Sequence, residues 1–414
     1  MRIVVLGGGV VGVTTAYQLQ RDGHEVVIVE RRGEVAAGAS LGNAGMIAPG
    51  HSFVWSSPRA PMILARSVLL RNQALRFKFS ADPRLYAWTL GFLKECTAAK
   101  ASRNTLLKHR LAAYSQSVLE SVVAQEAIAY DRNRRGILYL HRSRRALEDG
   151  VEHMKLLESD GQTIKVLDRN QVVALDPALA HAADRIAGAI LCPTDETGDC
   201  AKFTRALAAK VAERGGQIVT SARVAELATE GGRVAGALTD RGRFAGDAYV
   251  LALGADSPQL ARTLGVRLPI YPIKGYSLTI PIGASRSPPT VACVDEHNLV
   301  AISRFGDRLR VTATAEFAGY DESCKPSDFV FMKGVARELY PDGAEYDRAE
   351  MWAGLRPMTP TNLPFLGPTR LGNLFLNCGH GHIGWTMSHG SARIVADLIA
   401  GRTPAIPMDG LKAA

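Results

Sequence analysis

The chain has 414 residues, enough for two domains, because single hydrophobic cores stop growing near ~250 residues. Its 47% hydrophobic and 21% charged residues are typical of globular proteins and exclude collagen-like, disordered and coiled-coil classes. The 49 Lys and Arg outnumber the 40 Asp and Glu, and the excess is confined to residues 51–150, with 17 basic and 7 acidic side chains. This predicts one basic face rather than a uniformly basic surface for nucleic acid. Since Arg outnumbers Lys 37 to 12, genomic base composition explains the excess equally well.

The N-terminal thirty residues predict a dinucleotide-binding unit. An apolar run at residues 3–6 is followed by residues 7–12, which fit G-x-G-x-x-G, and then by a helical pattern. A second apolar run at residues 24–29 ends in Glu30, eighteen residues after Gly12. In such a βαβ unit the glycines let the backbone approach a pyrophosphate, and the acid holds the ribose hydroxyls. The alternative is a glycine-rich turn that only permits close packing of helix on strand. The acid disfavours a 2′-phosphate and hence NADP, so the choice is between NAD and FAD.

Later stretches favour FAD over NAD. Residues 38–47 form a loop of small residues, where backbone can lie against a flat ring system. The apolar run at 248–253 ends at Gly254, a second point of close approach for a nucleotide. The glycine-rich residues 379–384 precede a predicted helix over 385–400, whose N-terminus would stabilise the negative charge of a reduced flavin. Nicotinamide has no equivalent need, so we expect FAD as the cofactor.

The middle of the chain predicts a second domain. Residues 60–130 have helical patterns, strand patterns follow at 137–140, 163–167 and 188–191, and residues 270–315 alternate as in an antiparallel sheet. We therefore expect an α/β fold of two domains (α+β overall). A Rossmann-like FAD-binding domain with its βαβ unit accompanies a substrate domain with an antiparallel sheet and helices.

The cysteine pattern and the lengths of the apolar runs bear on the compartment. The six cysteines form no C-x-x-C pair and have no metal-ligand spacing with histidine, so we expect free thiols in a reducing compartment and no metal site. His380 and His382 lack acid or thiol partners in the sequence pattern. No apolar run approaches the ~20 residues that span a bilayer, and no signal-peptide pattern opens the chain. These features predict a cytoplasmic protein.

Motifs along almost the whole chain occur in the order seen in one enzyme family. They are the N-terminal G-x-G-x-x-G with Glu30, Asn43-Ala44-Gly45, residues 195–200, 271–277, 354–360, 379–381 and 384–388. Through them the chain resembles the D-amino-acid-oxidase superfamily of FAD-dependent oxidoreductases, and within it most closely the small-subunit bacterial D-amino acid dehydrogenases. It departs from the family at His51, where members have Tyr after Pro-Gly. This loop lies near the flavin in the family, so the departure bears on substrate identity.

The resemblance implies a division into domains and a reaction. The FAD-binding domain would comprise residues 1–50, 195–258 and 351–414, and the substrate domain residues 51–194 and 259–350. A D-amino acid would be oxidised to its imine by hydride transfer from Cα to flavin N5, and the imine would hydrolyse to a 2-oxo acid and ammonia. Dehydrogenases of this kind pass the electrons to a quinone or respiratory carrier.

Three residues are candidates for the catalytic site. Arg356 offers a bidentate guanidinium that can hold an amino acid carboxylate, the role of the Gly-Leu-Arg-Pro arginine in the family, although it could instead brace a proline-rich turn. Tyr276 would turn its hydroxyl toward the carboxylate, or else pack in the core. His51 would line the flavin, or else be solvated. Hydride loss from a neutral amine needs orientation and desolvation more than an obligatory acid or base.

The candidate cofactor-binding residues are mostly those of the glycine-rich turns, the acid and the small-residue loop. They are Gly7, Gly9, Val10, Val11, Gly12, Glu30, Arg31, Asn43, Ala44, Gly45, Met46, Val224, Gly254, Gly379, His380, Gly381, Gly384, Trp385 and Thr386.

Other functions stay open at this point. One is an oxidase or dehydrogenase of glycine, sarcosine or cyclic imino acids such as D-proline and hydroxy-D-proline. Another is an RNA-acting flavoprotein, which predicts a basic patch interleaved with aromatic residues; the sequence shows none, so we expect no nucleic acid partner. A third is a protein that holds FAD without turnover, against which the intact Arg356 motif argues.

The basic segment has two further explanations. It could steer carboxylate substrates toward the pocket, or rest on the anionic cytoplasmic face of the inner membrane, where a quinone acceptor is found. Arg59 to Lys78, in which Arg66, Arg71 and Arg76 lie among apolar residues, is where we expect a peripheral surface contact.

Overall fold

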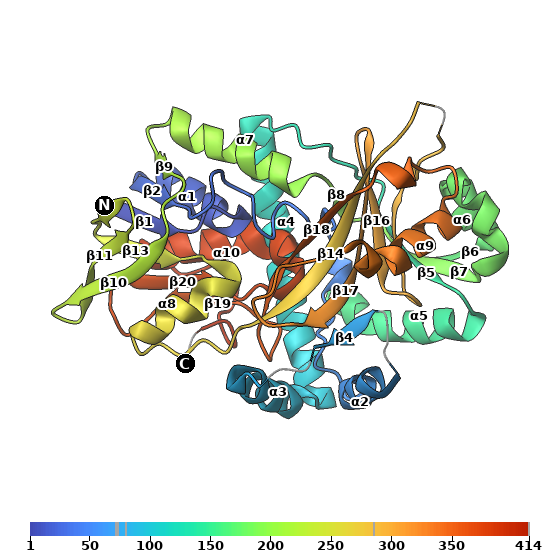
Figure 1. The fold of residues 1–414 in the computed structure, drawn as a ribbon, viewed down its shortest axis with the longest axis horizontal. Helices are drawn as coiled ribbons and strands as arrows, with labels where there is room; N and C mark the ends of the chain where they lie inside the picture. The colour runs from blue at the N-terminus through green and yellow to red at the C-terminus, as the bar shows by residue number, and fades with distance from the viewer. Residues whose placement is uncertain (71–73, 79–80, 285, 413–414) are drawn as a thin grey trace.

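In the described part of the chain, two large β-sheets lie side by side, each with its own helices (Figure 1). The computed structural model describes residues 1–414 except 71–73, 79–80, 285 and 413–414. The N-terminal βαβ unit and the C-terminal strand and helix meet in the smaller sheet, although nearly the whole chain separates them.

The smaller sheet has the strand order β19-β20-β13-β1-β2-β9 and is parallel except for the β19–β20 pair. Its central strand is buried on both faces, since Ile3 and Val5 belong to one apolar cluster while Val4 and Leu6 belong to another. The strands are β1 (Arg2–Leu6), β2 (Glu25–Val29), β9 (Gln217–Val219), β13 (Ala248–Leu251), β19 (Phe365–Pro368) and β20 (Leu374–Cys378).

Helices cover one face of this sheet, and a small antiparallel sheet with a short helix covers the other. The first face packs against α1 (Val10–Arg21), α4 (Ala98–Glu126), α7 (Cys200–Glu213) and α10 (Gly384–Ile399). The second packs against β10 (Val224–Glu230), β11 (Arg233–Thr239), β12 (Gly242–Phe244) and α8 (Ser257–Thr263). This is the layered arrangement that the N-terminal pattern predicts.

The larger sheet has the order β18-β14-β17-β16-β15-β5-β7-β6, with β4 paired to β17. It is mixed, because β5–β15 and β4–β17 are parallel while the other pairs are antiparallel. Its strands are β4 (Leu75–Phe77), β5 (Ile137–His141), β6 (Lys165–Asp168), β7 (Gly188–Cys192), β14 (Tyr271–Pro281), β15 (Ala292–Asp295), β16 (Val300–Phe305), β17 (Arg308–Phe317) and β18 (Glu350–Met358).

Further α-helices of the described residues surround the larger sheet, and local sequence explains the start of three of them. Asp82, Ser143 and Asp168 each accept a backbone N–H as N-caps of α3, α5 and α6. These helices are α2 (Ala60–Leu70), α3 (Pro83–Glu95), α5 (Arg144–Glu158), α6 (Arg169–Leu175) and α9 (Val330–Leu339). Short elements complete the fold: β3 (Met46–Ile47), β8 (Glu196–Thr197), η1 (Pro49–His51), η2 (Pro177–Arg185), η3 (Gly254–Asp256), η4 (Pro326–Asp328), η5 (Tyr346–Arg348) and η6 (Gly381–Ile383).

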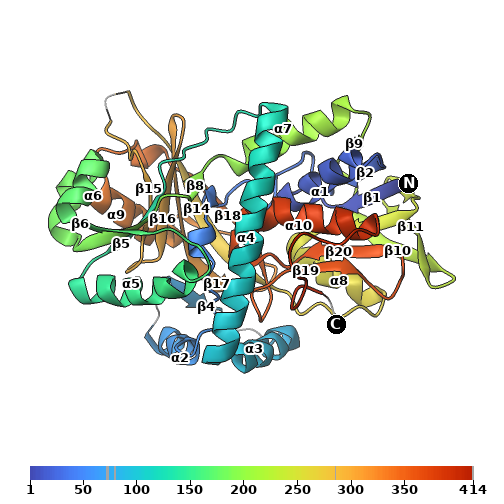
Figure 2. The same cartoon turned by 180° about the vertical axis from the view of Figure 1, so that it is seen from behind.

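The long helix α4 crosses the junction between the two sheets, as Figure 2 shows. It packs closely on α10, since a Cβ at Gly390 would lie 3.0 Å from the Ser115 backbone. The expected domain division assigns α4 and α10 to different domains, and its boundary at residue 351 falls inside β18, which pairs with β14 along its length. The division therefore stays a proposal, and a boundary after β18 would keep the larger sheet whole.

Candidate active site

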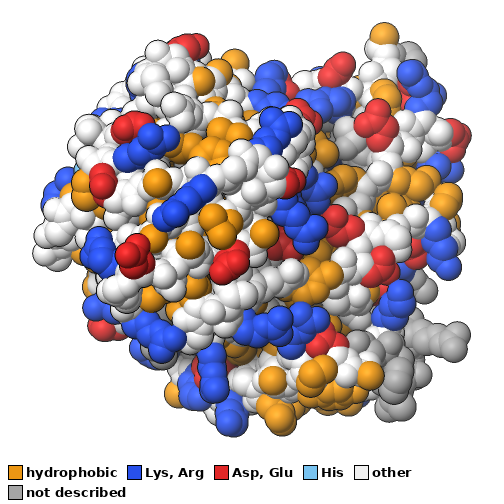
Figure 3. Space-filling model, turned by 60° about the vertical axis from the view of Figure 1, so that its left-hand side comes forward, with side chains coloured by type: hydrophobic (Ala, Val, Ile, Leu, Met, Phe, Trp, Pro, Cys, Tyr) orange, Lys and Arg blue, Asp and Glu red, His pale blue; other side chains and the backbone are white. Residues whose placement is uncertain are grey.

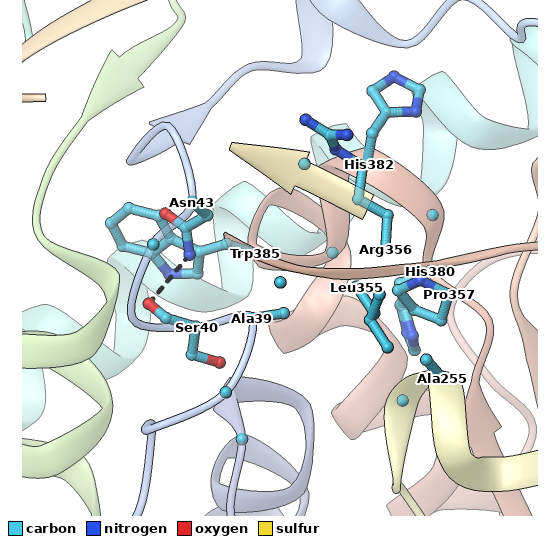
Figure 4. A pocket seen from close by; sticks show the side chains of 18 of the residues that line it. Ala39, Ser40, Asn43, Ala255, Leu355, Arg356, Pro357, His380, His382 and Trp385 are labelled. Carbon is cyan, nitrogen blue, oxygen red and sulfur yellow. Dashed lines mark hydrogen bonds between the residues drawn. The ribbon is translucent and has the colours of Figure 1, made fainter. Parts of the chain in front are cut away.

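A cavity of about 420 Å³ opens between the two sheets. It is lined by the first turn of α1, the loop 36–48, η3, strands β14, β17 and β18, and the segment from η6 into α10. Figure 4 shows part of it, with Ser40, Asn43 and Trp385 on one side of the view and Arg356 and His382 on the other. Segments from both ends of the chain and from both sheets therefore build one site.

The glycine-rich turn brings α1 to one end of this cavity. A Cβ at Gly12 would lie 1.8 Å from the Gly7 carbonyl oxygen, so only glycine allows the helix to start there. The N-cap residue Gly9 has no side chain that could cap the helix N-terminus. One N–H of the first turn, that of Val10, is bound by Ser40 Oγ at 2.9 Å. The N-terminus of α1 is thus directed at the cavity, where an anion such as a pyrophosphate is stabilised.

Glu30 and two arginines surround this end of the cavity. The Glu30 carboxylate accepts the N–H groups of Gly8 and Arg32, at 2.7 and 2.8 Å, which fixes it at the end of β2. Arg31 pairs with Asp256 of η3 at 2.9 Å, and Arg32 with Glu322 at 3.1 Å. Charged groups are therefore positioned where the sequence predicts the ribose and pyrophosphate to lie.

The loop 36–48 is held in shape by its own hydrogen bonds and by the larger sheet. Asn43 accepts the Gly45 N–H at 2.8 Å and donates to the Ser40 carbonyl at 3.2 Å, the bond drawn in Figure 4. Arg310 of β17 donates to the carbonyls of Leu41 and Asn43, and burial lowers the pKa of Arg310 to about 10. Strand β17 of the larger sheet thus positions the loop expected to bind the cofactor.

The turn before α10 forms another wall of the cavity. Like α1, α10 begins without a side-chain cap. The indole N–H of Trp385, which lines the cavity, is buried and has no hydrogen-bond partner among the described residues. Thr386 instead supports the loop, since its hydroxyl accepts the Ala48 N–H and donates to the Met46 carbonyl. His380, whose pKa burial lowers to about 3, bonds Ser391 at 3.0 Å.

Arg356 projects into the cavity from β18. Its guanidinium donates to the carbonyls of Thr314, at 2.9 Å, and Lys274, at 3.3 Å. Burial lowers its pKa to about 10, and no carboxylate among the described residues forms an ion pair with it. Arg356 is half-buried, and a guanidinium on a cavity wall with no carboxylate partner in the described part of the chain is a binding site for an anion.

Tyr276 and His51 differ in how they face the cavity. The Tyr276 hydroxyl bonds the Glu316 carboxylate, and its ring packs edge-on against Phe329, so this hydroxyl is already engaged, as the core-packing alternative expects. His51 lines the cavity and stacks on Tyr139, with ring centroids 5.6 Å apart. Burial lowers the pKa of His51 to about 4, which keeps the ring neutral.

Most of the cofactor candidates line the cavity, and a few do not. Gly12, Gly379 and Thr386 lie directly behind its wall, whereas Val224 starts β10 and packs in the apolar cluster that includes Leu227. Because Val224 does not line the cavity, the structure does not support it as a cofactor contact. The candidates that do line the cavity are Gly7, Gly9, Val10, Val11, Glu30, Arg31, Asn43, Ala44, Gly45, Met46, Gly254, His380, Gly381, Gly384 and Trp385.

Sequence reasoning did not identify Trp55, Trp352 and His382 as lining residues or Arg310 as a support. Trp352 carries a usable signal, because it shares a strand face with Arg356 by the two-residue period. The others are brought in by tertiary structure, for which the local pattern gives no signal.

Among the described residues, no helix combines the length and apolar composition needed to cross a bilayer. In that same part of the chain, no three His, Cys, Asp or Glu side chains are grouped as metal ligands, and the six cysteines are free.

The fold and the uncapped helix termini around this cavity define a dinucleotide-dependent oxidoreductase. Residues 2–398 match the model of the DAO family, described as FAD dependent oxidoreductase, and the chain belongs to this family. The residues present fit FAD, since the α1 N-terminus, Glu30 and the unpartnered Trp385 N–H all border one cavity.

Named relatives are similar in sequence over almost the whole chain. It is 42% identical over 412 residues to D-amino acid dehydrogenase 2 of Mesorhizobium japonicum, covering 99% of each chain. It is 44% identical over 414 residues to D-amino acid dehydrogenase of Paramagnetospirillum magneticum, covering 99% of this chain and 98% of the relative. In fold it is similar to glycine oxidase from Geobacillus kaustophilus, with a TM-score of 0.76 and 24% identity over 100% of this chain and 98% of that one.

Proposed function

We propose that this protein is an FAD-dependent D-amino acid dehydrogenase. The carrying observation is Arg356, a half-buried guanidinium on the cavity wall that has no ion-pair partner among the described residues. It suits a substrate carboxylate, and the names of the full-length relatives supply the D-amino acid and the dehydrogenase class.

Arg356 orients the substrate rather than reacting with it. Arg356 would hold the carboxylate by charge-assisted hydrogen bonds, which fixes the position of Cα. FAD, when bound, supplies the acceptor for the hydride that leaves Cα. The α10 N-terminus and the Trp385 N–H would favour negative charge beside them. Trp55 and Trp352 shield the cavity from water and thereby strengthen these interactions.

Anaerobic bleaching of the flavin absorbance tests this function. We expect D-amino acids to bleach it while their L-enantiomers do not, and a dye acceptor to support faster turnover than oxygen. Bleaching by glycine, sarcosine or cyclic imino acids alone would instead assign the alternative substrates. Absence of bleaching by every amino acid would leave a flavin-binding protein.

We further propose that electrons pass to a quinone or respiratory carrier and that α2 and α3 dock on an anionic membrane. Apolar side chains gather at the lower end of the molecule, where these helices lie, with basic ones beside them (Figure 3). Exposed Arg59, Arg66 and Lys94 make the surface complementary to anionic lipid. The exposed apolar residues of this docking face are Met62, Ile63, Phe77, Tyr86, Leu90 and Leu93.

Part of the segment that the sequence singled out, residues 71–73 including Arg71, lies outside the described residues. Arg76 does not belong to this docking face, because it is half-buried and paired with Asp328 at 3.3 Å. The proposed contact therefore rests on α2 and α3 themselves.

A further inference from the structure

Besides Arg356 and His380, the cavity wall carries two histidines that contact each other, with a buried lysine beside one of them. His382 of η6 and His51 of η1 both line the cavity, and their rings meet edge to face with centroids 5.8 Å apart. Lys108 of α4 is 1% exposed, and its Nζ lies 3.4 Å from His382 Nε2. Three elements far apart in sequence thus place three nitrogen-bearing side chains in contact.

Lys108 is an unusual buried lysine. Among the described residues its other hydrogen-bond partner is the Phe53 carbonyl, at 3.3 Å, and no carboxylate there pairs with it. Burial lowers its pKa to about 7, so the neutral amine and the charged ammonium are both populated near neutral pH. A lysine in this state can take up a proton and release it again.

His382 connects Lys108 to the cavity. Its Nδ1 is buried without a hydrogen-bond partner in the described part of the chain, while its ring stacks on Trp55 with centroids 5.0 Å apart. Burial, with Lys108, His51 and Arg356 nearby, keeps the pKa of His382 well below its ordinary value. The ring is therefore neutral. When Lys108 is an amine that accepts the Nε2 proton, Nδ1 keeps a lone pair for which the described residues offer no donor.

No lining carboxylate competes for this role beside Arg356. The acids that line the cavity are already bonded at the dinucleotide end, Glu30 to backbone, Asp256 to Arg31 and Glu322 to Arg32. Behind His51, the Tyr139 hydroxyl donates to Asp195 at 2.9 Å. The histidine nitrogens are thus the available proton acceptors near the expected substrate carboxylate.

We propose that His382 and Lys108 form a proton relay that deprotonates the substrate ammonium before the hydride leaves. This rests on the proposed D-amino acid oxidation. The ammonium N–H bond breaks and its proton binds His382 Nδ1, while the Nε2–H bond breaks and that proton binds Lys108 Nζ. The substrate amine then keeps its lone pair, which forms the C=N bond as Cα releases hydride, with its electron pair, to the flavin.

The charges around the relay favour this direction of transfer. Burial disfavours a positive charge on Lys108, and His382, which contacts Lys108, also lies near the positive charge of Arg356. A bound substrate carboxylate offsets the charge of Arg356. Lys108 then gains affinity for the proton that the ammonium must lose.

Stopped-flow reduction of the FAD-loaded protein by a D-amino acid tests the relay across pH. For the natural chain we expect the rate to increase with pH along a limb centred near 7. In Lys108→Met and His382→Gln the limb should move up by more than one pH unit, toward the pKa of the substrate amino group. The rate at pH 6.5 should fall about 100-fold and recover at high pH. Lys100→Met, which removes an exposed charge from the same helix, should leave the profile unchanged.

The outcomes separate the relay from the proposed function. The relay is wrong, while the function stands, if the rate of flavin reduction in the natural chain follows only the pKa of the substrate amino group. The same holds if both variants keep the pH profile of the natural chain. This first comparison needs no variant, so a variant that fails to bind FAD does not block the test. If no D-amino acid reduces the flavin of the natural chain at any pH, the proposed function is wrong and the relay falls with it.

Discussion

The guanidinium of Arg356 lies directly over the backbone of Gly275 in the neighbouring strand. A Cβ at Gly275 would be 2.5 Å from the guanidinium carbon, and this arginine is anchored nearby by the Thr314 carbonyl. Glycine at this position of β14 therefore allows the Arg356 guanidinium to lie where it can bind the expected carboxylate. The φ angle of Gly275 is not positive, so other residues could adopt this backbone conformation. Glycine is needed here because there is no space for a Cβ.

From this contact we expect Gly275→Ala to displace Arg356 and raise KM for the D-amino acid about tenfold or more, with FAD still bound. A misplaced charge-assisted pair loses on the order of 1.5–3 kcal/mol. Steady-state kinetics with a dye acceptor measure this effect. Gly334→Ala is the matched control, because a Cβ at Gly334 of α9 meets nothing within 4 Å. An unchanged KM in Gly275→Ala would show that this contact does not position the arginine.

Removal of the side chain itself should have a larger effect. We expect Arg356→Ala to raise KM about 100-fold, because the carboxylate loses its charged partner in a buried site. The flavin spectrum should stay that of the natural chain, since Arg356 contacts β14 and β17 rather than the dinucleotide end. Arg356→Lys should fall between the two, as a lysine keeps the charge but not the bidentate geometry. An unaltered KM in Arg356→Ala would remove this residue from the substrate site.

Glu30 provides a test at the other end of the cavity. Its carboxylate holds the Gly8 and Arg32 N–H groups, so Glu30→Ala loses the support of the glycine-rich turn as well as the expected ribose contact. We expect FAD affinity to fall about tenfold or more, measured by reconstitution of the apoprotein, with little change in KM for the substrate. Glu34→Ala is a suitable control, because Glu34 is exposed and pairs on the surface with Arg205. Equal affinity in Glu30→Ala would contradict this role.

The two ends of the chain could be predicted because their signals are local. The spacing from Gly7 to Glu30 and the turn at Gly379–Gly384 each fit a strand, a glycine-rich turn and a helix, and the structure has these elements there. Gly12 is one position that requires glycine, because a Cβ there would lie 1.8 Å from the Gly7 carbonyl oxygen and no other residue fits. Backbone requirements of this kind are therefore readable without the fold.

The Lys108–His382 contact could not be predicted in this way. The two residues are 274 positions apart, and Lys108 looks like one more charge in a basic helical segment until α4 is placed across the junction. Arg310 is similar, because its bonds to the loop carbonyls at 41 and 43 depend on how the two sheets meet. For Tyr276 the strand was predicted, but the position of its hydroxyl depends on Glu316 of β17.

The docking face on α2 and α3 predicts binding to anionic bilayers. We expect the protein to sediment with vesicles containing phosphatidylglycerol at low salt, less at high salt, and not with purely phosphatidylcholine vesicles. Leu90→Glu, at a side chain that is 62% exposed, should weaken binding without loss of stability. Val330→Glu, at a side chain 67% exposed on α9, is the control and should bind as the natural chain does. No binding at low salt would leave substrate steering or base composition as the origin of the basic excess.

Asp195 gives a prediction about stability and pH. It is fully buried, accepts the Gly50 N–H at 3.0 Å and the Tyr139 hydroxyl at 2.9 Å, and burial raises its pKa to about 7. In the unfolded chain an aspartate has a pKa of about 3.9. Between these values the folded protein holds a proton that the unfolded chain has released, so the free energy of unfolding falls as pH rises through this window.

Asp195→Asn should remove that contribution, since an amide keeps an acceptor for the Gly50 N–H but does not ionise. Relative to the natural chain, the variant should gain about 2 kcal/mol of stability between pH 5 and pH 7, because one pKa unit corresponds to about 1.4 kcal/mol. Burial and Asp295 also raise the pKa of Glu296 to about 7. The resulting pH dependence of stability is the same in both proteins and cancels in the difference between them. Urea unfolding of both proteins at the two pH values measures it. A difference in stability that does not change with pH would show that Asp195 is already ionised in the folded protein.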